Sequence, residues 1–318
     1  MLHFISEKNT YDAILEILKR FPPISSKDVE TIIYDLISKK LYTSSISLIL
    51  YDDRFDIQKN LLQLLDVAIE VNNHQIVSII LEHPKVKNTP INDIIFSSAV
   101  TNNRLEIVKL LLTRKDLDII IDNNIGIHIG ISTNIITEYA IEFISTNNHI
   151  DMAILLIKYG KINPVHRNNI AIKCASLYEH IELVKLLLAD NRVDPAVDNN
   201  LAILTASCRN NYKIVELLLN DPRVNPADKD NYAIKWACRS GCTEVVKLLL
   251  LDKRIDPTVE DNFSIKWASF YGHTQIVKLL IDDGRADPTA EDNFAIRYAI
   301  RNKHTLLVKL LLNNIHLL

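Results

Sequence analysis

The hydrophobic positions of this chain recur in short helical patterns separated by polar turns. Apolar residues within 171–175 are spaced three to four apart and give one face, and those within 181–188 give a second. Residues 178–180 separate the two patterns, and the segment 190–200 is rich in Asn, Asp and Pro, which favours a turn. Pro195 cannot continue the preceding helix. The pattern predicts two short helices followed by a turn.

This unit repeats every 31 residues, and three independent markers keep the same step. The first is Asn169-Ile-Ala-Ile-Lys-Cys-Ala175, which returns with variations at 200–206, 231–237, 262–268 and 293–299. The second is a run of three aliphatic residues near the end of each unit. The third is a proline in each turn, found at Pro164, Pro195, Pro226, Pro257 and Pro288.

The same register continues more faintly toward the N-terminus. Helices of about ten residues are marginal alone in water, so each must bury its apolar face on the next unit. The sequence therefore predicts an all-α repeat solenoid of about ten helix-pair units. Residues 1–61 are expected to form degenerate capping units, and residues 62–318 the repeat array. An insertion near 113–137 interrupts the array, and it is either a functional loop or a decayed repeat.

The repeat resembles the ankyrin family most plainly over residues 262–281. Gly272-His273 followed by Ile276-Val277-Lys278-Leu279-Leu280 is the stretch most typical of that family. Three features depart from the family pattern: the opening Thr-Pro-Leu-His is replaced by Ala-Ile-Lys or its variants, Asn stands for the turn glycine, and the unit is shorter than the usual ~33 residues. This short form is similar to ankyrin proteins of giant DNA viruses such as the mimiviruses.

The resemblance implies a protein-interaction scaffold that docks its partner on the concave face, built from turn tips and inner-helix ends. Aromatic and arginine side chains at those places are expected to act as anchors, because such residues dominate protein interfaces. The predicted partner-binding residues are Tyr178, Arg209, Tyr232, Arg239, Phe263, Phe270, Tyr271, Phe294 and Arg301. An alternative is that the turn aromatics pack against neighbouring turns. Trp236 and Trp267 are interpreted as core packing.

Composition adds several exclusions. The net charge is -3 with pI about 6.4, and no basic arm points to nucleic acid. No secretory leader or apolar run long enough to span a bilayer is apparent, so no membrane association is predicted. Four cysteines suit a reducing compartment. We expect an intracellular, cytoplasmic monomer, located in the host cytoplasm if the source is viral.

No catalytic residue, cofactor or metal site is predicted, because the sequence contains no nucleophile elbow, phosphate loop or zinc-protease motif. Cys238 and Cys242 are interpreted as structural, and His180, His273 and His304 as turn-bridging residues. Rows of Lys and Arg recur beside rows of Asp at the 31-residue step. They predict either a turn-locking or solvated charge network or, as the sharper alternative, a phosphate-binding row.

The sequence therefore predicts a protein that is not an enzyme and that binds another protein, a host protein if the source is viral. Two alternatives remain open. One is a substrate adaptor for a ubiquitin ligase, although neither end shows an F-box or BTB pattern. The other is a structural component of a virion.

Overall fold

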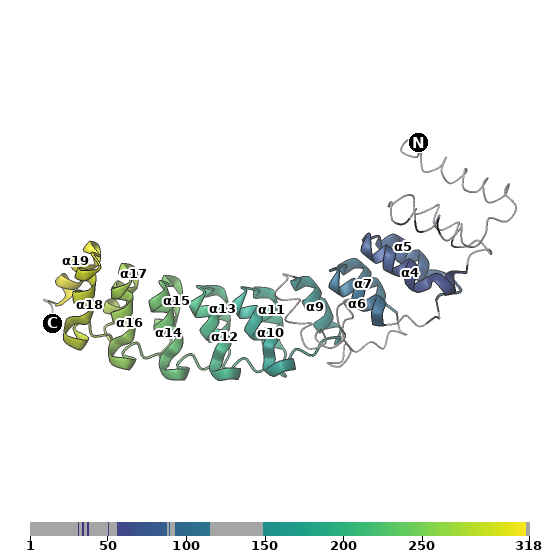
Figure 1. The fold of residues 1–318 in the computed structure, drawn as a ribbon. Helices are drawn as coiled ribbons and strands as arrows, with labels where there is room; N and C mark the ends of the chain where they lie inside the picture. The colour runs from purple at the N-terminus through teal and green to yellow at the C-terminus, as the bar shows by residue number, and fades with distance from the viewer. Residues whose placement is uncertain are drawn as a thin grey trace, which may run out of the picture. The chain divides into compact units, whose positions relative to one another are not determined.

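The computed structural model describes residues 56–114 apart from 88 and 90–92, residues 149–315, and four isolated earlier positions. These residues form fifteen helices and no strand, and the turns between helix pairs contain no hairpin (Figure 1). The prediction of an all-α repeat solenoid is confirmed. Most of the predicted capping units at 1–61 and most of the insertion near 113–137 lie outside the described residues.

The chain divides into two compact units, Met1–Ala140 with Lys158–Ile162, and Ile141–Ile157 with Asn163–Leu318. In the first unit, α4 (Ile57–Glu70) packs on α5 (His74–Glu82) and on α6 (Asp93–Thr101), and α6 packs on α7 (Leu105–Leu112). Asp56 caps α4 by accepting hydrogen bonds from the backbone N–H groups of Gln58 and Lys59. Arg104 joins the two helix pairs, because its guanidinium donates to the carbonyls of Ile69 at 2.9 Å and Glu70 at 2.7 Å.

The second unit contains α9 (Ile150–Lys158) and five consecutive helix pairs. We call the first helix of each pair the inner helix and the second the outer helix. Inner helices contact inner helices, and outer helices contact outer helices, in two parallel rows (Figure 1). The pairs are α10 (His166–Leu177) with α11 (Ile181–Ala189), α12 (Val197–Cys208) with α13 (Tyr212–Leu219), α14 (Asp228–Ser240) with α15 (Thr243–Leu251), α16 (Val259–Phe270) with α17 (Thr274–Asp283), and α18 (Ala290–Arg301) with α19 (Thr305–Ile315).

The core lies between the two rows of helices. Each inner helix turns an Ala/Ile face toward it, and the alanine at the end of the repeated motif is fully buried at Ala175, Ala206, Ala237, Ala268 and Ala299. A small side chain is needed there because the inner helices approach closely. Each outer helix contributes three aliphatic residues, such as Val245, Val246 and Leu249, all with no exposed area. Burial of these stripes supplies the stability that helices of this length lack alone.

Near its start, within the bounds given above, every inner helix contains three consecutive residues in the left-handed conformation, and the regular helix begins after them. In α14 they are Lys229, Asp230 and Asn231, with φ of 50°, 53° and 58°. The last two positions are Asn or Asp in all five pairs, the residues that tolerate this conformation best after glycine. Asn200, at the end of the predicted turn segment 190–200, has a φ of 58°.

The third of these residues, always asparagine, links adjacent pairs. Its side-chain oxygen accepts a hydrogen bond from a backbone N–H group 25 residues later, in the turn of the next pair. The four bonds measure 2.7–3.0 Å, from the N–H groups of Asp194, Asn225, Asp256 and Asp287 to Asn169, Asn200, Asn231 and Asn262. This bond explains why asparagine replaces the family's turn glycine: glycine could adopt the conformation but has no side chain to accept the bond.

Two of the three histidines predicted to bridge turns, His273 and His304, connect adjacent pairs. The ring nitrogens Nε2 of His273 and His304 lie 3.1 Å from the carbonyl oxygens of Arg239 and Phe270. The glycines of the preceding pairs make room for these rings. A Cβ atom on Gly272, whose φ is +78°, would lie 2.6 Å from the ring of His304.

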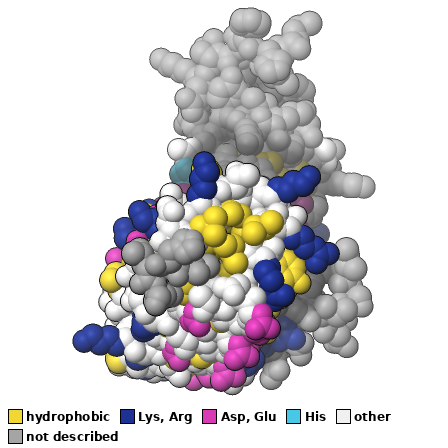
Figure 2. Space-filling model, turned by 90° about the vertical axis from the view of Figure 1, so that its left-hand side faces the viewer, with side chains coloured by type: hydrophobic (Ala, Val, Ile, Leu, Met, Phe, Trp, Pro, Cys, Tyr) yellow, Lys and Arg dark blue, Asp and Glu magenta, His cyan; other side chains and the backbone are white. Residues whose placement is uncertain are grey.

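The last described inner helix, α18, exposes an apolar residue at a position that is buried in α16. Ile300 of α18 is 59% exposed, whereas Ser269 occupies the equivalent position of α16 and has no exposed area. Figure 2 faces this end of the second unit and shows hydrophobic side chains grouped there. A position that the next pair covers in earlier repeats is therefore open on α18.

Replacing Ala237 with Leu should overpack the contact between inner helices. We expect a loss of about 1–3 kcal/mol in the free energy of unfolding, measured by urea denaturation. Ala189→Leu is the matched control, because Ala189 is exposed at the end of α11. Equal stability of the two variants would contradict this description of the core.

Two substitutions at Asn231 separate the roles of its conformation and its side chain. Both Asn231→Gly and Asn231→Ala lose the bond from the N–H group of Asp256, but the alanine variant keeps a β-carbon in the left-handed conformation, whereas the glycine variant has none. The alanine variant should therefore be less stable than the glycine variant by about 1 kcal/mol in urea denaturation. An alanine variant at least as stable as the glycine variant would disprove the conformational argument.

Candidate functional site

The inner helices carry aromatic side chains on the side facing away from the core. In α14, α16 and α18 the aromatic positions are spaced three to four residues apart, so they share one helix face. Most are half-buried, and Tyr271 is 42% exposed. We call this set the aromatic strip, and its members are Tyr232, Trp236, Phe263, Trp267, Phe270, Tyr271, Phe294 and Tyr298.

The rings of the strip contact one another within and between pairs. The turn aromatic of each pair packs on an aromatic residue one helical turn later, with centroids 5.7 Å apart for Phe263 and Trp267 and 4.2 Å apart for Phe294 and Tyr298. Phe270 joins two pairs, since its centroid lies 5.4 Å from that of Tyr298. The turn aromatics therefore pack mainly along their own helix, not against neighbouring turns.

Arg239 is held among three of these rings. Its guanidinium carbon lies 4.5 Å from the ring centroid of Trp236, 5.3 Å from that of Trp267 and 6.0 Å from that of Tyr271. Each contact is a cation–π arrangement. The arginine therefore occupies a fixed position on the strip and remains only half-buried.

The interpretation of Trp236 and Trp267 as core residues is wrong. Both are half-buried, and the core positions beside them are filled by Ala233, Ile234 and Ala237. The reason is helical geometry: the two tryptophans follow the turn aromatic by four residues and so share its face. That spacing is visible in the sequence and could have placed them on the strip.

Three of the predicted partner-binding residues contact the strip less or not at all. Tyr178 is 48% exposed and stacks on His180 in its own pair, with centroids 6.1 Å apart. Arg301 is exposed near the ring of Tyr298, at 5.7 Å. Arg209 is exposed at the end of α12, and it lines a pocket. The structure thus brings Tyr232, Arg239, Phe263, Phe270, Tyr271 and Phe294 together.

A ladder of ion pairs runs beside the strip. A lysine of one inner helix binds the first left-handed residue of the next pair, with a nitrogen–oxygen distance of 2.6 Å in Lys173–Asp198, Lys235–Glu260 and Lys266–Glu291. Lys235 and Lys266 are only 1% and 7% exposed, whereas the side chains of Glu260 and Glu291 are 52% and 47% exposed, so each pair joins a buried ammonium to a half-exposed carboxylate. The ammonium of Lys235 also lies 4.9 Å from the ring centroid of Tyr232.

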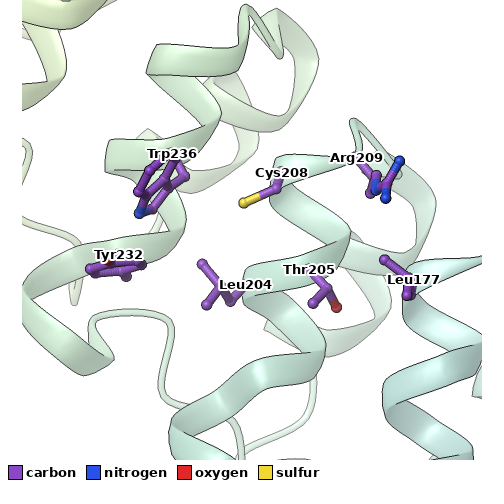
Figure 3. Close-up of a pocket in the computed structure, with 7 residues that line it drawn as sticks. All are labelled: Leu177, Leu204, Thr205, Cys208, Arg209, Tyr232 and Trp236. Atoms are coloured by element: carbon purple, nitrogen blue, oxygen red, sulfur yellow. The ribbon is translucent and has the colours of Figure 1, made fainter.

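The ladder is interrupted between α12 and α14. Leu204 stands at the lysine position and Lys229 at the acid position, so neither partner of the pair is present. A pocket of about 210 Å³ opens at this interruption (Figure 3). Three consecutive inner helices and the C-cap of α12 line it, with Leu177, Leu204, Thr205, Cys208, Arg209, Tyr232 and Trp236.

The recurring arginines of the turns hold the repeats together. Arg223 binds the carboxylate of Asp221 at 2.6 Å and donates to the carbonyls of Leu188 and Val193 in the preceding pair, both at 2.8 Å. Arg254 and Arg285 make the equivalent contacts. These guanidinium groups are engaged by protein oxygens, which supports the turn-locking network over a phosphate-binding row. Hydrogen bonds from Arg223 lower the pKa of Asp221 below its usual range.

The cysteines have the environment of structural thiols. Burial raises the pKa of Cys208 to about 11, so it is a protonated thiol at neutral pH. Burial likewise raises the pKa of Cys242, whose Sγ lies 3.8 Å from the carbonyl oxygen of Cys208. Within the described parts of the chain, no group of three His, Cys, Asp or Glu residues could hold a metal ion, and no helix is long and apolar enough to cross a bilayer.

The repeat geometry agrees with the comparison to protein families. Residues 172–261 match the model for three copies of the ankyrin repeat, and residues 265–293 match that for a single ankyrin repeat. This stretch is an ankyrin repeat array. Ankyrin repeats are in general protein–protein interaction modules rather than catalytic domains. No curated protein matches the chain.

The Asp–Arg contacts between ankyrin repeats should make the array sensitive to acid. The folded state lowers the pKa of Asp221, so its contribution is complete above the unfolded pKa of about 3.9 and is lost as the pH falls through the lower folded value. Asp221→Asn should reduce stability at neutral pH and flatten the loss below about pH 4. Urea midpoints across this range measure both effects.

Glu244→Gln is the control for this experiment, because Glu244 is an exposed carboxylate on α15. It should change neither the midpoint at neutral pH nor the slope in acid. An Asp221→Asn variant with the pH dependence of the unmodified protein would show that the arginine contact contributes nothing.

Proposed function

We propose that this chain is a scaffold that binds a partner protein on the aromatic strip of α14, α16 and α18. Aromatic and arginine side chains contribute most of the binding energy at protein interfaces. The strip concentrates both on the one helix face that the core does not use. The outer helices present exposed lysines such as Lys247 and Lys278, and their exposed apolar residues, such as Leu251 and Leu306, form no such row of stacked rings.

The observation that carries the proposal is the position of Arg239. Its guanidinium is already stacked among Trp236, Trp267 and Tyr271 before any partner is bound. An anchor that is ordered in advance loses less conformational entropy on binding, which favours affinity. Tyr271 beside it stays 42% exposed, so a partner could still cover it.

The proposal also covers the kind of partner, the oligomeric state and the cellular compartment. We propose that the chain acts as a monomer in the cytoplasm, that its partner is a host protein, and that it catalyses no reaction. The short repeat, with asparagine at the turn, is similar to ankyrin proteins of giant DNA viruses and supports a host partner. Free cysteines, among them the buried Cys238, are compatible with a reducing compartment.

Truncating two anchors tests the proposal. The double variant Tyr271→Ala with Arg239→Ala should weaken a genuine partner by roughly 1–4 kcal/mol. The partner is first identified by affinity purification from the native host cell, and its affinity is then measured by calorimetry. The melting curve should stay almost unchanged, because neither side chain belongs to the core.

Charge changes at Lys247 and Lys278, on the outer helices, are the control and should leave binding intact. Normal binding by the double variant, together with loss of binding in these controls, would place the site on the outer helices instead. Ubiquitin-ligase subunits in the same purification would favour an adaptor. Recovery of the chain in purified virus particles would favour a structural role.

A further inference from the structure

The interruption of the ion-pair ladder is a coordinated change of two positions 25 residues apart. On either side, Lys173 pairs with Asp198 and Lys235 pairs with Glu260. Between them, the lysine position is Leu204 and the acid position is Lys229. A leucine beside an acid would leave a carboxylate unpaired, and two lysines would repel. The combination of Leu204 and Lys229 avoids both the unpaired carboxylate and the repulsion. It also removes the ion pair that covers the equivalent surface in the neighbouring pairs.

Lys229 occupies this position at a conformational cost. It has a φ of 50° and ψ of 52°, a left-handed conformation that costs roughly 1–2 kcal/mol for a residue with a β-carbon. At the equivalent positions, Glu260 and Glu291 form ion pairs with the preceding inner helix. Among the described residues, Lys229 forms no ion pair, so its charge is available to a ligand.

The pocket at the interruption has the size and lining for one apolar side chain. Its volume of about 210 Å³ is below the ~300–1,000 Å³ typical of sites for drug-sized ligands and cofactors. Figure 3 shows Leu204 in the middle, with Tyr232 and Trp236 on one side and Leu177 on the other. The lining is predominantly hydrophobic, which matches an aliphatic or aromatic side chain.

One cation lines this pocket, and a second lies outside its lining at the start of α14. Arg209 follows the end of α12 and lines the pocket itself, and Lys229 precedes the helical part of α14 at the opposite end of the inner helices. The nearby carboxylate of Asp228 is already engaged, because it accepts hydrogen bonds from the side chain of Asn200 and the backbone of Lys229, both at 2.9 Å. A ligand carrying carboxylates would complement Arg209 and Lys229.

We infer that the pocket between α10, α12 and α14 captures an apolar side chain of a linear peptide segment in which acidic residues flank that side chain. The inference rests on the proposed function and specifies the chemistry of the partner. Leu204 and Arg209 are five residues apart, about 7.5 Å along the helix. An extended peptide advances about 3.3 Å per residue, which places the carboxylate roughly two residues from the apolar side chain.

The experiment selects peptides from a display library of random linear sequences on the full-length chain. Enriched peptides should contain Asp or Glu about two residues from a Leu, Ile, Met or Phe. Synthetic copies are then measured by fluorescence anisotropy. In the variant Leu204→Lys with Lys229→Glu, which rebuilds the ion pair of the neighbouring repeats, their affinity should fall about tenfold or more.

Two further variants complete the design. Lys247→Gln alters net charge by the same amount on an outer helix and should keep the affinity of the unmodified chain. Circular dichroism shows whether the variant Leu204→Lys with Lys229→Glu folds. If it does not, Arg209→Glu tests the same pocket, because it changes an exposed side chain. Its affinity for the peptides should also fall about tenfold.

A second readout locates the peptide. Cys208 lines the pocket and is half-buried, whereas Cys174, Cys238 and Cys242 are buried. Bound peptide should therefore slow alkylation of Cys208 by iodoacetamide, followed by mass spectrometry of the digested chain. Unchanged alkylation with saturating peptide would overturn the inference.

The outcomes separate this inference from the proposed function. It fails if no peptide is enriched, if enriched peptides lack acidic residues, or if the rebuilt ladder binds them unchanged. In a different outcome, peptides bind the rebuilt-ladder variant with unchanged affinity but bind the variant Tyr271→Ala with Arg239→Ala more weakly. That result would leave the aromatic strip as the binding site and refute only the pocket. Peptides whose affinity depends on neither the pocket nor the aromatic strip, and that require Lys247 or Lys278, would refute both this inference and the proposed function.

Discussion

An asparagine in the left-handed conformation governs how each repeat of the second unit meets the next. Its backbone reverses the chain just before the inner helix, and its side-chain oxygen accepts a hydrogen bond from the following turn, as in the 2.8 Å bond from the N–H group of Asp256 to Asn231. One residue thus sets the local conformation and the spacing between pairs. Because the bond spans 25 residues within a 31-residue repeat, an insertion between the two groups would break it.

Other contacts across the pairs depend on that spacing. Arg223 reaches the carbonyls of Leu188 and Val193, and His273 reaches the carbonyl of Arg239, only because the pairs are held at a constant offset. The Ala/Ile faces then stack without space for larger residues, as the complete burial of Ala237 shows. Stability is therefore distributed over nearest-neighbour interfaces, as expected for a repeat protein.

Because the core-facing positions and the turns make the stacking contacts, the residues on the outward face of the inner helices are free to vary. The positions that stack repeat almost unchanged, whereas the outward positions are aromatic in α14, α16 and α18 and mostly aliphatic or small in α12. The aromatic strip and the pocket at Leu204 are two results of that freedom. Both lie on one helix face, and they meet at Tyr232 and Trp236, which belong to the strip and also line the pocket.

The sequence by itself determined the repeat, the helix pairs and the buried alanines, because a 31-residue step and a helical period are properties of order along the chain. It also identified Tyr232, Arg239 and Tyr271 as surface candidates. Only the tertiary structure decided which charges pair, since Lys235 binds Glu260 of the next repeat rather than an acid of its own turn. It also revealed the pocket beside Leu204. These features depend on distances between residues 25 or more apart, which the stacking of successive repeats sets and the local pattern does not contain.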